Sequence, residues 1–478
     1  MSQLAAPTGL LIGGEWLQTE EKLPVMDPAT FTVLAEIGNA SVSDGLDAVA
    51  AAHDAFLTWS VTPARVRAEV LRKAFEIMTA EVEVCARLIS LENGKAWRDA
   101  MGEATYAAEF FRWFSEEAVR ISGRYSIAPT GGTRLLTMKQ PVGPVYAITP
   151  WNFPLAMGTR KIGPALAAGC TVVIKPAAQT PLTTLALAAV LIEAGLPDGV
   201  VNVITTSTSG PVSEPIISDP RLRKLTFTGS TGVGQRLIEQ SAKQVLKVSM
   251  ELGGNAPFVV FADADLDKAV DGAMLAKMRN IGEACTAANR FIVHESLAPE
   301  FSRRLAERMG AMSIGRGIED GVQVGPLVDN AAVEKVTELV TDAIGHGAEV
   351  LTGGEAIDGP GHFYPPTVLT GVPTHAKMFR EEIFGPVAPI STFTTDDEGI
   401  AMANDTEYGL VAYAFTQDLT RALTVAERLE TGMVGINQGI VSNPAAPFGG
   451  VKASGLGREG GFEGIEEYLE TKYVGIKL

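Results

Sequence analysis

Apolar and polar positions follow a helical period through most of the first third of the chain. Ser43 can cap the first helix, and longer helical patterns follow at about 64–91 and 103–121. Between about 124 and 140, turn residues and short alternation replace that period. We therefore expect a mostly helical first third that ends in a β-ribbon.

From Val145 onward, short apolar runs alternate with helical patterns. The runs are PVYAI, TVVIK, VVNVI and KLTFT, with helices expected near 155–168 and 180–194. Such alternation predicts βαβ units and a parallel sheet. A second α/β block begins near Leu252 with the strand PFVVF and a helix capped by Asp265, and the chain ends in the strand candidate KYVGIKL.

Composition narrows the classes of function. The 478-residue chain has a net charge of −17, which argues against binding to nucleic acid or to anionic membranes. No basic residue precedes Lys22, and the longest uncharged stretch, 140–159, contains four prolines, so we expect neither a leader peptide nor a membrane helix. The five histidines and three cysteines form no metal-binding spacing, so no metal site is expected. A cytoplasmic protein that handles small molecules is the resulting expectation.

One of the three cysteines has surroundings that suit a nucleophile. Cys285 follows a glycine that should break the preceding helix, and small neighbours would leave its thiol accessible. A buried core cysteine is a comparable alternative for Cys285. For Cys85, within a helical pattern, and Cys170, beside an apolar strand, the core reading is preferred.

Two further polar residues lie at predicted strand ends. Glu251 stands beside a Gly-Gly turn between two apolar strands, where an ordinary solvated carboxylate is the alternative. Asn152, in TPWNFP, follows the PVYAI strand at the edge where ligands gather in parallel sheets. Its amide can donate to a developing oxyanion, or simply form a turn before Pro154.

Seven motifs together carry a family resemblance. TPWNFP, VVIKPAAQTP, FTGSTGVG, MELGGNAP, NIGEACTAANR, EEIFGPV and PFGGVKASGLGRE occur in the order found in the aldehyde dehydrogenase superfamily. The chain resembles this family over essentially its whole length. The resemblance implies a Rossmann-type dinucleotide domain (1–123 and 142–251), an α/β catalytic domain (252–454) and a β-ribbon oligomerisation element (124–141 and 455–478). It also implies a homodimer or homotetramer.

The resemblance assigns three catalytic roles. Cys285 would attack the aldehyde carbon to give a thiohemiacetal, while the Asn152 amide and the Cys285 backbone N–H hold the oxyanion. After hydride transfer to a nicotinamide, Glu251 would act as the general base that hydrolyses the thioester, a role that favours a raised pKa. The thiol and the cofactor carry this chemistry without a metal.

The resemblance also marks a cofactor site. KLTFT followed by Gly229 and Ser230 gives a strand, a tight turn and a helix start that can face a pyrophosphate, although the motif is not GxGxxG. Lys175 would reach the adenosine ribose, and Ala178 stands where NAD-preferring relatives carry a Glu, so we expect NADP, with NAD possible. The other implied cofactor residues are Trp151, Leu252, Glu382 and Phe384; without the resemblance, Phe384 is better read as a core aromatic.

The implied substrate has a distal carboxylate. Arg160, Arg279 and Ser442 match the carboxylate-binding positions of succinate semialdehyde dehydrogenases, and Phe448 is implied beside the substrate. A pair of structural arginines is the alternative. We expect succinate semialdehyde, with glutarate semialdehyde or a broader aldehyde range as the runner-up, because one methylene discriminates by only ~1–3 kcal/mol. A non-catalytic protein on the same fold is a remote alternative.

Overall fold

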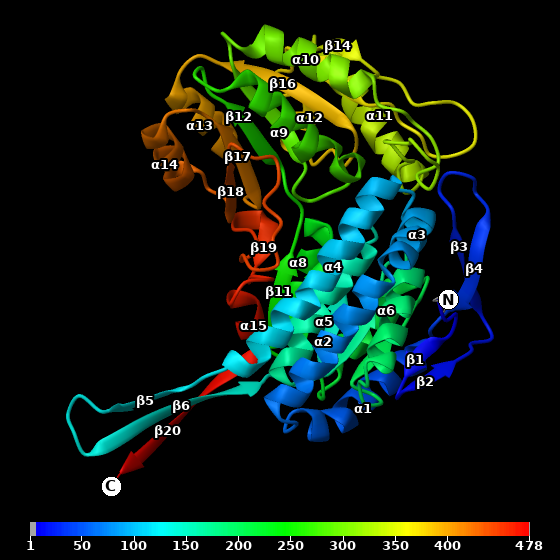
Figure 1. Cartoon of the computed structure of the whole chain (residues 1–478), viewed down its shortest axis with the longest axis vertical. Helices are drawn as coiled ribbons and strands as arrows, with labels where there is room; N and C mark the ends of the chain where they lie inside the picture. The colour runs from blue at the N-terminus through cyan, green and yellow to red at the C-terminus, as the bar shows by residue number, and fades with distance from the viewer. Residues whose placement is uncertain (1–5, 478) are drawn as a thin grey trace.

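Two sheets organise the part of the chain that the structure, a computed structural model, describes, residues 6–477 (Figure 1). The first has eight strands in the order β19-β11-β10-β7-β8-β9-β1-β2. Its five central strands are parallel, and β19, β1 and β2 pair antiparallel at the edges. Their bounds are β1 (Leu10–Ile12), β2 (Glu15–Leu17), β7 (Val145–Ile148), β8 (Val172–Lys175), β9 (Val201–Val203), β10 (Lys224–Thr228), β11 (Lys247–Glu251) and β19 (Gly455–Leu456).

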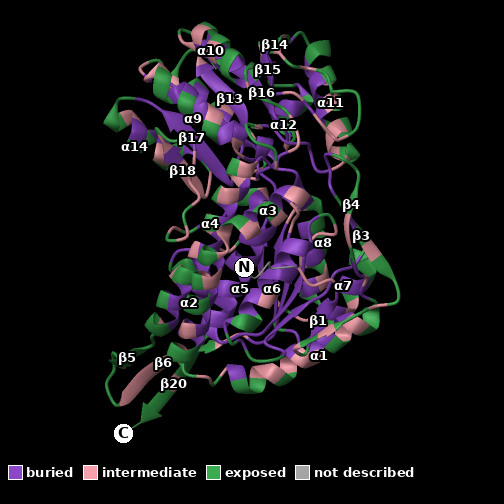
Figure 2. Ribbon diagram, turned by 45° about the vertical axis from the view of Figure 1, so that its right-hand side comes forward, coloured by how far each residue is buried: buried purple, intermediate pink, exposed green. Residues whose placement is uncertain are grey.

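Eight helices belong to this first unit. They are α1 (Val42–Trp59), α2 (Ala64–Ala80), α3 (Val82–Asn93), α4 (Trp97–Glu117), α5 (Pro154–Ala168), α6 (Leu182–Glu193), α7 (Ser209–Ser218) and α8 (Thr231–Ala242). Every residue of α5 is buried because α2, α4 and α6 pack around it. Buried residues concentrate in the two sheets and in α5 (Figure 2). The segment that starts α5 and the helix itself therefore have a fixed position.

The second sheet has seven strands in the order β14-β15-β16-β13-β12-β17-β18, all parallel to their neighbours except β14. The strands are β12 (Ala256–Val260), β13 (Ala288–His294), β14 (Glu349–Thr352), β15 (Thr367–Thr370), β16 (Val387–Phe393), β17 (Val411–Phe415) and β18 (Met433–Ile436). Its helices are α9 (Leu266–Met278), α10 (Ala298–Gly310), α11 (Asn330–Gly345), α12 (Lys377–Arg380), α13 (Asp396–Asn404) and α14 (Leu419–Arg428).

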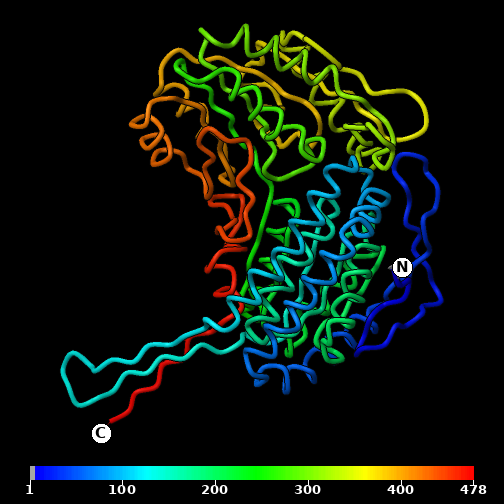
Figure 3. The backbone as a smooth tube through the Cα atoms, in the orientation of Figure 1, coloured from blue at the N-terminus to red at the C-terminus, as the bar shows by residue number. Residues whose placement is uncertain are grey.

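A three-stranded ribbon extends away from both sheets (Figure 3). It is formed by β5 (Arg124–Ile127), β6 (Thr133–Pro141) and β20 (Leu469–Lys477), and β6 pairs with both other strands. The short helix α15 (Glu463–Glu466) precedes β20. Gly455–Leu456, which the expected boundaries place with the ribbon, pairs with β11 in the first sheet instead. The domain boundaries themselves stay a prediction.

The α/β fold class is confirmed, but several local predictions are wrong. The first third also contains β1, β2 and the hairpin β3 (Lys22–Met26) and β4 (Val33–Gly38), which the helical reading missed. Ser41, not Ser43, caps α1. The Ser41 hydroxyl accepts the Asp44 backbone N–H, and the Asp44 carboxylate accepts the Ser41 backbone N–H, which forms a capping box. The single pattern at 64–91 is two helices that meet at Glu81. No helix within residues 6–477 is long and apolar enough to cross a membrane.

Candidate active site

One cavity of about 350 Å³ brings the three proposed catalytic residues together. Asn152 reaches it from the segment between β7 and α5, Glu251 from the last position of β11, and Cys285 from the segment between α9 and β13. The cavity therefore lies between the carboxyl ends of β7 and β11 in the first sheet and the connection from α9 to β13 in the second unit. Six of the implied cofactor residues also line it: Trp151, Gly229, Ser230, Leu252, Glu382 and Phe384.

A strained turn presents Cys285. The helix α9 ends at Met278, earlier than the predicted break at Gly282, because Asn280 and Ile281 both have positive φ angles of 51° and 49°. Such angles are uncommon for residues with a side chain and persist only where the surroundings enforce them. At Gly282 a side chain would collide with the Gly385 carbonyl oxygen. The thiol that follows is partly buried, which raises the pKa of Cys285 to about 12, while the nearby positive charge of Arg160 opposes that rise.

The remaining cysteines differ from Cys285. Cys170 is fully buried in the core of the first unit, as expected. Cys85 is only partly buried and packs against the edge of the same core. Burial raises the pKa of each to about 11, and neither lines the cavity that contains Cys285.

Asn152 lines the cavity, and its side-chain amide uses only one of its two N–H groups within the described residues. Its Nδ2 donates to the Glu283 carbonyl at 3.0 Å, which uses one of the two amide N–H groups. The other has no protein partner among residues 6–477. The Asn152 carbonyl oxygen, in turn, accepts hydrogen bonds from Lys95 Nζ at 2.7 Å and from Asn280 Nδ2 at 3.0 Å. Asn152 is thus held by hydrogen bonds to its backbone carbonyl and from one of its two side-chain amide N–H groups.

Glu251 is a buried carboxylate with an unused oxygen. Its Oε2 makes no hydrogen bond with the described residues. Burial raises the pKa of Glu251 well above its usual value, and the neighbouring Glu459 carboxylate raises it further, whereas Arg160 and Lys161 oppose the shift. A carboxyl group of raised pKa is a stronger base, as general-base catalysis near neutral pH requires.

Lys161 and Glu459 were not identified from the sequence. Glu459 forms a buried ion pair with Lys161 Nζ at 2.7 Å and lies 2.8 Å from Arg160 Nη2. Although burial raises the pKa of Glu459, these two cations hold it below its usual value. Two adjacent cations inside the otherwise apolar pattern of α5 were the available signal, since buried charges require partners.

The two arginines expected to bind a carboxylate lie beside their expected neighbours. The Arg160 guanidinium stands 3.9 Å from the centroid of the Phe448 ring, and Arg279 Nη1 donates to Ser442 Oγ at 3.2 Å. Neither pair lines the 350 Å³ cavity, yet both arginine charges act on the Cys285 thiol. Arg160 Nη2 is occupied by the ion pair with Glu459, whereas the buried Nε makes no hydrogen bond within residues 6–477. The Arg160 guanidinium therefore keeps one donor for a further polar partner.

The residues implied at the nicotinamide end are compatible with a dinucleotide. A side chain at Gly229 would collide with the Phe227 ring, so only glycine leaves this turn open at the start of α8. The Glu382 Oε1 accepts the Gly254 N–H at 3.2 Å, and burial raises the pKa of Glu382 to about 7. Phe384 adopts a positive φ of 55° and lies edge-on to Trp151, with ring centroids 5.4 Å apart. It lines the cavity rather than the core.

The residues implied at the adenosine end lie outside this cavity. Lys175 ends β8, next to the end of β7, and its Nζ donates to Ser209 Oγ at 3.1 Å. Burial lowers the pKa of Lys175 to about 8, so the side chain is cationic below that pH. Ala178 is half-buried in the following turn.

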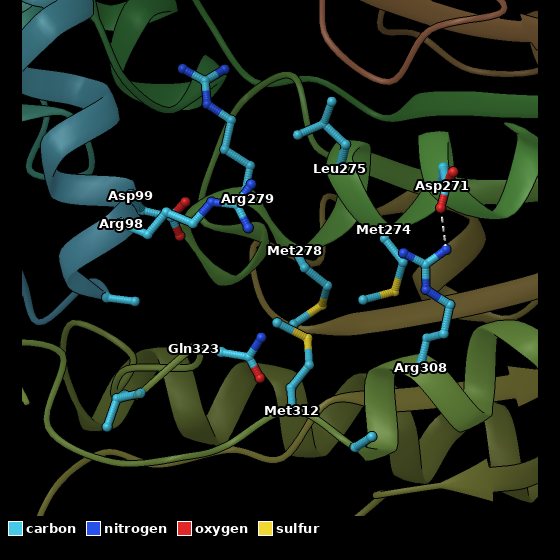
Figure 4. Close-up of a pocket in the computed structure, with 13 residues that line it drawn as sticks. Arg98, Asp99, Asp271, Met274, Leu275, Met278, Arg279, Arg308, Met312 and Gln323 are labelled. Carbon is cyan, nitrogen blue, oxygen red and sulfur yellow. Dashed lines mark hydrogen bonds and ion pairs between the residues drawn. The ribbon is translucent and has the colours of Figure 1, made fainter. Parts of the chain in front are cut away.

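A second cavity of about 670 Å³ is lined in part by Arg279, the first residue of the turn at 279–282 (Figure 4). Three methionines, three arginines and Asp99 are among its lining residues, and Cys285, Glu251 and Asn152 are not. Figure 4 shows Asp99 and Arg98 projecting from α4 toward Arg279. The Asp99 Oδ2 accepts the Asn280 N–H at 3.0 Å. The turn that precedes Cys285 is therefore held from the side of the larger cavity as well.

Comparisons with known proteins identify the family to which the chain belongs. The profile of the aldehyde dehydrogenase family matches residues 16–474. A succinate-semialdehyde dehydrogenase of Paenarthrobacter nicotinovorans is 57% identical over 444 residues, which are 93% of this chain and 99% of the relative. A glutarate-semialdehyde dehydrogenase of Pseudomonas putida is 49% identical over 469 residues, or 98% of this chain and 97% of the relative. The crystal structure of an E. coli NADP-dependent enzyme superimposes with a TM-score of 0.98 at 50% identity, covering 100% of this chain and 99% of that one. The chain belongs to the aldehyde dehydrogenase family.

Proposed function

We propose that this chain oxidises succinate semialdehyde to succinate with NADP, through a thiohemiacetal and a thioester on Cys285. The observation that carries the proposal is the single 350 Å³ cavity lined by Cys285, Asn152 and Glu251. A thiol, an amide donor and a basic carboxylate in one enclosure are the groups that a cysteine-based aldehyde oxidation requires. A non-catalytic protein would have no need of this set.

Each group has a defined task in that reaction. The Cys285 sulfur bonds to the aldehyde carbon after its proton leaves, and Arg160 and Arg279 favour the thiolate. The free N–H of Asn152 and the Cys285 backbone N–H donate to the oxyanion that forms. Bound NADP supplies the hydride acceptor. Glu251 then takes a proton from the water that attacks the thioester, which releases the acid and restores the thiol.

The cofactor preference rests on Lys175 and Ala178. Lys175 supplies a buried cation at the end of β8, and Ala178 brings no negative charge that would repel a 2′-phosphate. The likeness to an NADP-dependent E. coli enzyme supports the same preference. NAD remains usable because neither residue obstructs a free ribose hydroxyl.

The substrate class rests on the arginines. Arg160 presents a buried Nε that has no hydrogen-bond partner among the described residues, and Arg279 is oriented by Ser442. Their charges favour an aldehyde that carries a distal carboxylate. Glutarate semialdehyde is the second candidate, supported by the similarity to a glutarate-semialdehyde dehydrogenase.

The ribbon supports an assembly of two or four copies. Tyr125, Ile127 and Tyr473 on its outer strands are exposed, so apolar surface is available for another copy of the chain. Since Cys285 must stay reduced, the reducing cytoplasm is the proposed compartment.

The test is a kinetic panel. The wild-type enzyme is mixed with NADP or NAD and with succinate semialdehyde, glutarate semialdehyde or the uncharged aldehyde butanal, and the NADPH burst is recorded. We expect kcat/KM to be at least 10²-fold higher for the semialdehydes than for butanal. Arg279→Ala should raise KM for succinate semialdehyde about tenfold or more and leave butanal unchanged. Arg98→Ala, which removes an arginine from the second cavity, is the matched control.

Two results would refute the proposal in different places. Equal losses on both aldehydes in Arg279→Ala would remove the carboxylate-binding role. The absence of NADPH formation with every aldehyde, in protein whose Cys285 is intact, would place the chain with the non-catalytic alternative.

A further inference from the structure

Three charged residues lie at the start of α4. Asp99 and Glu103 are four residues apart and share one face of the helix, and Lys95 lies just before the helix begins. The side chains of Lys95 and Glu103 are fully buried, and their Nζ–Oε2 distance is 2.5 Å. Burial of two charges costs several kcal/mol per ion unless every donor and acceptor finds a partner. The contacts of this pair therefore show what it holds in place.

Apart from their own ion pair, the Lys95 and Glu103 side chains direct their hydrogen bonds within residues 6–477 to the segment that carries Asn152. Lys95 Nζ donates to the Asn152 carbonyl at 2.7 Å and lies 4.1 Å from the centroid of the adjacent Phe153 ring. Glu103 Oε1 accepts the backbone N–H groups of Leu155 at 2.9 Å and Ala156 at 3.2 Å. These N–H groups belong to the first turn of α5, where no backbone carbonyl of the helix can accept them. Because α5 has no side-chain N-cap of its own, Glu103 takes that role.

The same carbonyl is tied to the segment that carries Cys285. Asn280 Nδ2 donates to the Asn152 carbonyl at 3.0 Å and to the Glu283 carbonyl at 2.8 Å. The Glu283 carbonyl also accepts a hydrogen bond from Asn152 Nδ2, and the Asp99 carboxylate accepts one from the Asn280 N–H. Asn152 is therefore clamped between α4 and the strained turn before Cys285.

We propose that Lys95, held by Glu103, is a positioning residue that aims the free amide N–H of Asn152 at the oxyanion. The inference rests on the proposed role of Asn152. Lys95, which is ion-paired to Glu103 of α4, and Asn280 of the turn both donate to one carbonyl, so the peptide after Asn152 has a fixed orientation. Loss of the lysine leaves only the Asn280 bond and lets that peptide rotate. A displacement of 1 Å at a catalytic donor can cost about 10²-fold in rate.

The test removes both charges together, since a single substitution would strand the other charge in the core. In Lys95→Met/Glu103→Gln, the glutamine oxygen can keep accepting the Leu155 and Ala156 N–H groups, so α5 stays capped. Lys224→Met/Glu467→Gln is the matched control: Lys224 is also fully buried beside a glutamate, at 3.5 Å, at the end of β10 opposite the cavity. Glu103→Gln alone is the second variant, because it frees Lys95 from the ion pair without removing it.

The readout is the rate constant of the NADPH burst in a single turnover, per titrated Cys285 thiol, beside the KM for succinate semialdehyde. Lys95→Met/Glu103→Gln should slow the burst about 10- to 10²-fold with KM within about threefold. Glu103→Gln alone should lower the burst rate constant about three- to tenfold, and Lys224→Met/Glu467→Gln should lower it less than about twofold. In an Asn152→Ala background the double substitution should add less than about twofold, because it acts through Asn152.

The outcomes separate the two proposals. If Asn152→Ala alone bursts at the wild-type rate, the proposed role of Asn152 is wrong, and this inference fails with it. If Asn152→Ala is slow but the double variant, or Glu103→Gln where the double does not fold, is as fast as wild type, only the role of Lys95 is overturned. A full additional loss in the Asn152→Ala background also overturns it, since a general loosening of the core would act independently of Asn152.

Discussion

Glu459→Gln should move the acid limb of thioester hydrolysis to lower pH. In the wild-type site, burial and the Glu459 carboxylate raise the pKa of Glu251, which must be ionised to act as a base. The substitution removes that anion and leaves the charges of Arg160 and Lys161 without their acidic partner. Both changes stabilise the Glu251 carboxylate, so they lower its pKa in the same direction.

The size of this shift follows from Coulomb's law. For illustration, two unit charges separated by about 6 Å at an effective dielectric constant of ~20 interact by about 3 kcal/mol, which corresponds to about two pKa units. The Glu459 carboxylate is already partly balanced by cations within 2.8 Å, which reduces its field at Glu251. We therefore expect the limb to move down by at least about one unit.

The assay isolates hydrolysis from hydride transfer. Enzyme, NADP and a limiting amount of succinate semialdehyde are mixed between pH 5 and 9, and the decay of the thioester after the NADPH burst is followed by acid quench. Glu467→Gln, a carboxylate that contacts Lys224 away from the cavity, is the control and should leave the limb unchanged. A limb that stays in place or moves up in Glu459→Gln would refute the coupling between the two carboxylates.

Three further changes have defined outcomes. Ala178→Glu should lower kcat/KM for NADP at least about tenfold while NAD changes less than about threefold, because the new carboxylate repels a 2′-phosphate; equal effects in steady-state assays would contradict the adenosine-site assignment. Alkylation of Cys285 by iodoacetamide should accelerate continuously from pH 7 to 9.5 without a plateau, since burial raises its thiol pKa to about 12; a plateau below pH 9, measured on the Cys285 peptide, would show a thiolate stabilised more than the structure indicates. Phe111→Ala should cost about 3–5 kcal/mol in urea unfolding, because the ring is fully buried against α5; a loss under about 1 kcal/mol would show that this core relaxes freely.

The fold was predictable where a segment's own pattern decides its structure. The strands β7, β8 and β12 are buried on both faces, so their sequences are almost entirely apolar runs between helices. The hairpin β3–β4 was not predictable in this way, since its residues are mostly exposed or half-buried and show no clean alternation. The boundary at Glu81 lacks both glycine and proline, so neither of the usual breakers marked the end of α2.

The site was predictable in its chemistry and not in its support. Cys285, Glu251 and Asn152 lie on turns or strand ends inside recognisable motifs, and the cavity that they share follows from parallel strands. The contact between Lys161 and Glu459 spans 298 residues, and that between Lys95 and Asn152 spans 57. No local periodicity carries such information; only the requirement that a buried charge be paired marks these residues as a group.

That requirement also resolves how a chain of net charge −17 can attract an anionic substrate. Next to the thiol, the charges of Arg160 and Arg279 are opposed by two carboxylates, Glu382 and Glu251. Burial raises the pKa of both carboxylates, so protonation of either one leaves the local charge positive while the chain as a whole is negative. The excess of positive charge is larger when Glu251 is protonated, because only one of the two carboxylates is then ionised. The raised pKa of Glu251 extends this state to higher pH. An entering carboxylate neutralises part of this excess and so reduces the field that favours the Cys285 thiolate. Thiolate formation before substrate entry is consequently favoured, and the pH dependence of iodoacetamide alkylation should shift upward when succinate occupies the site.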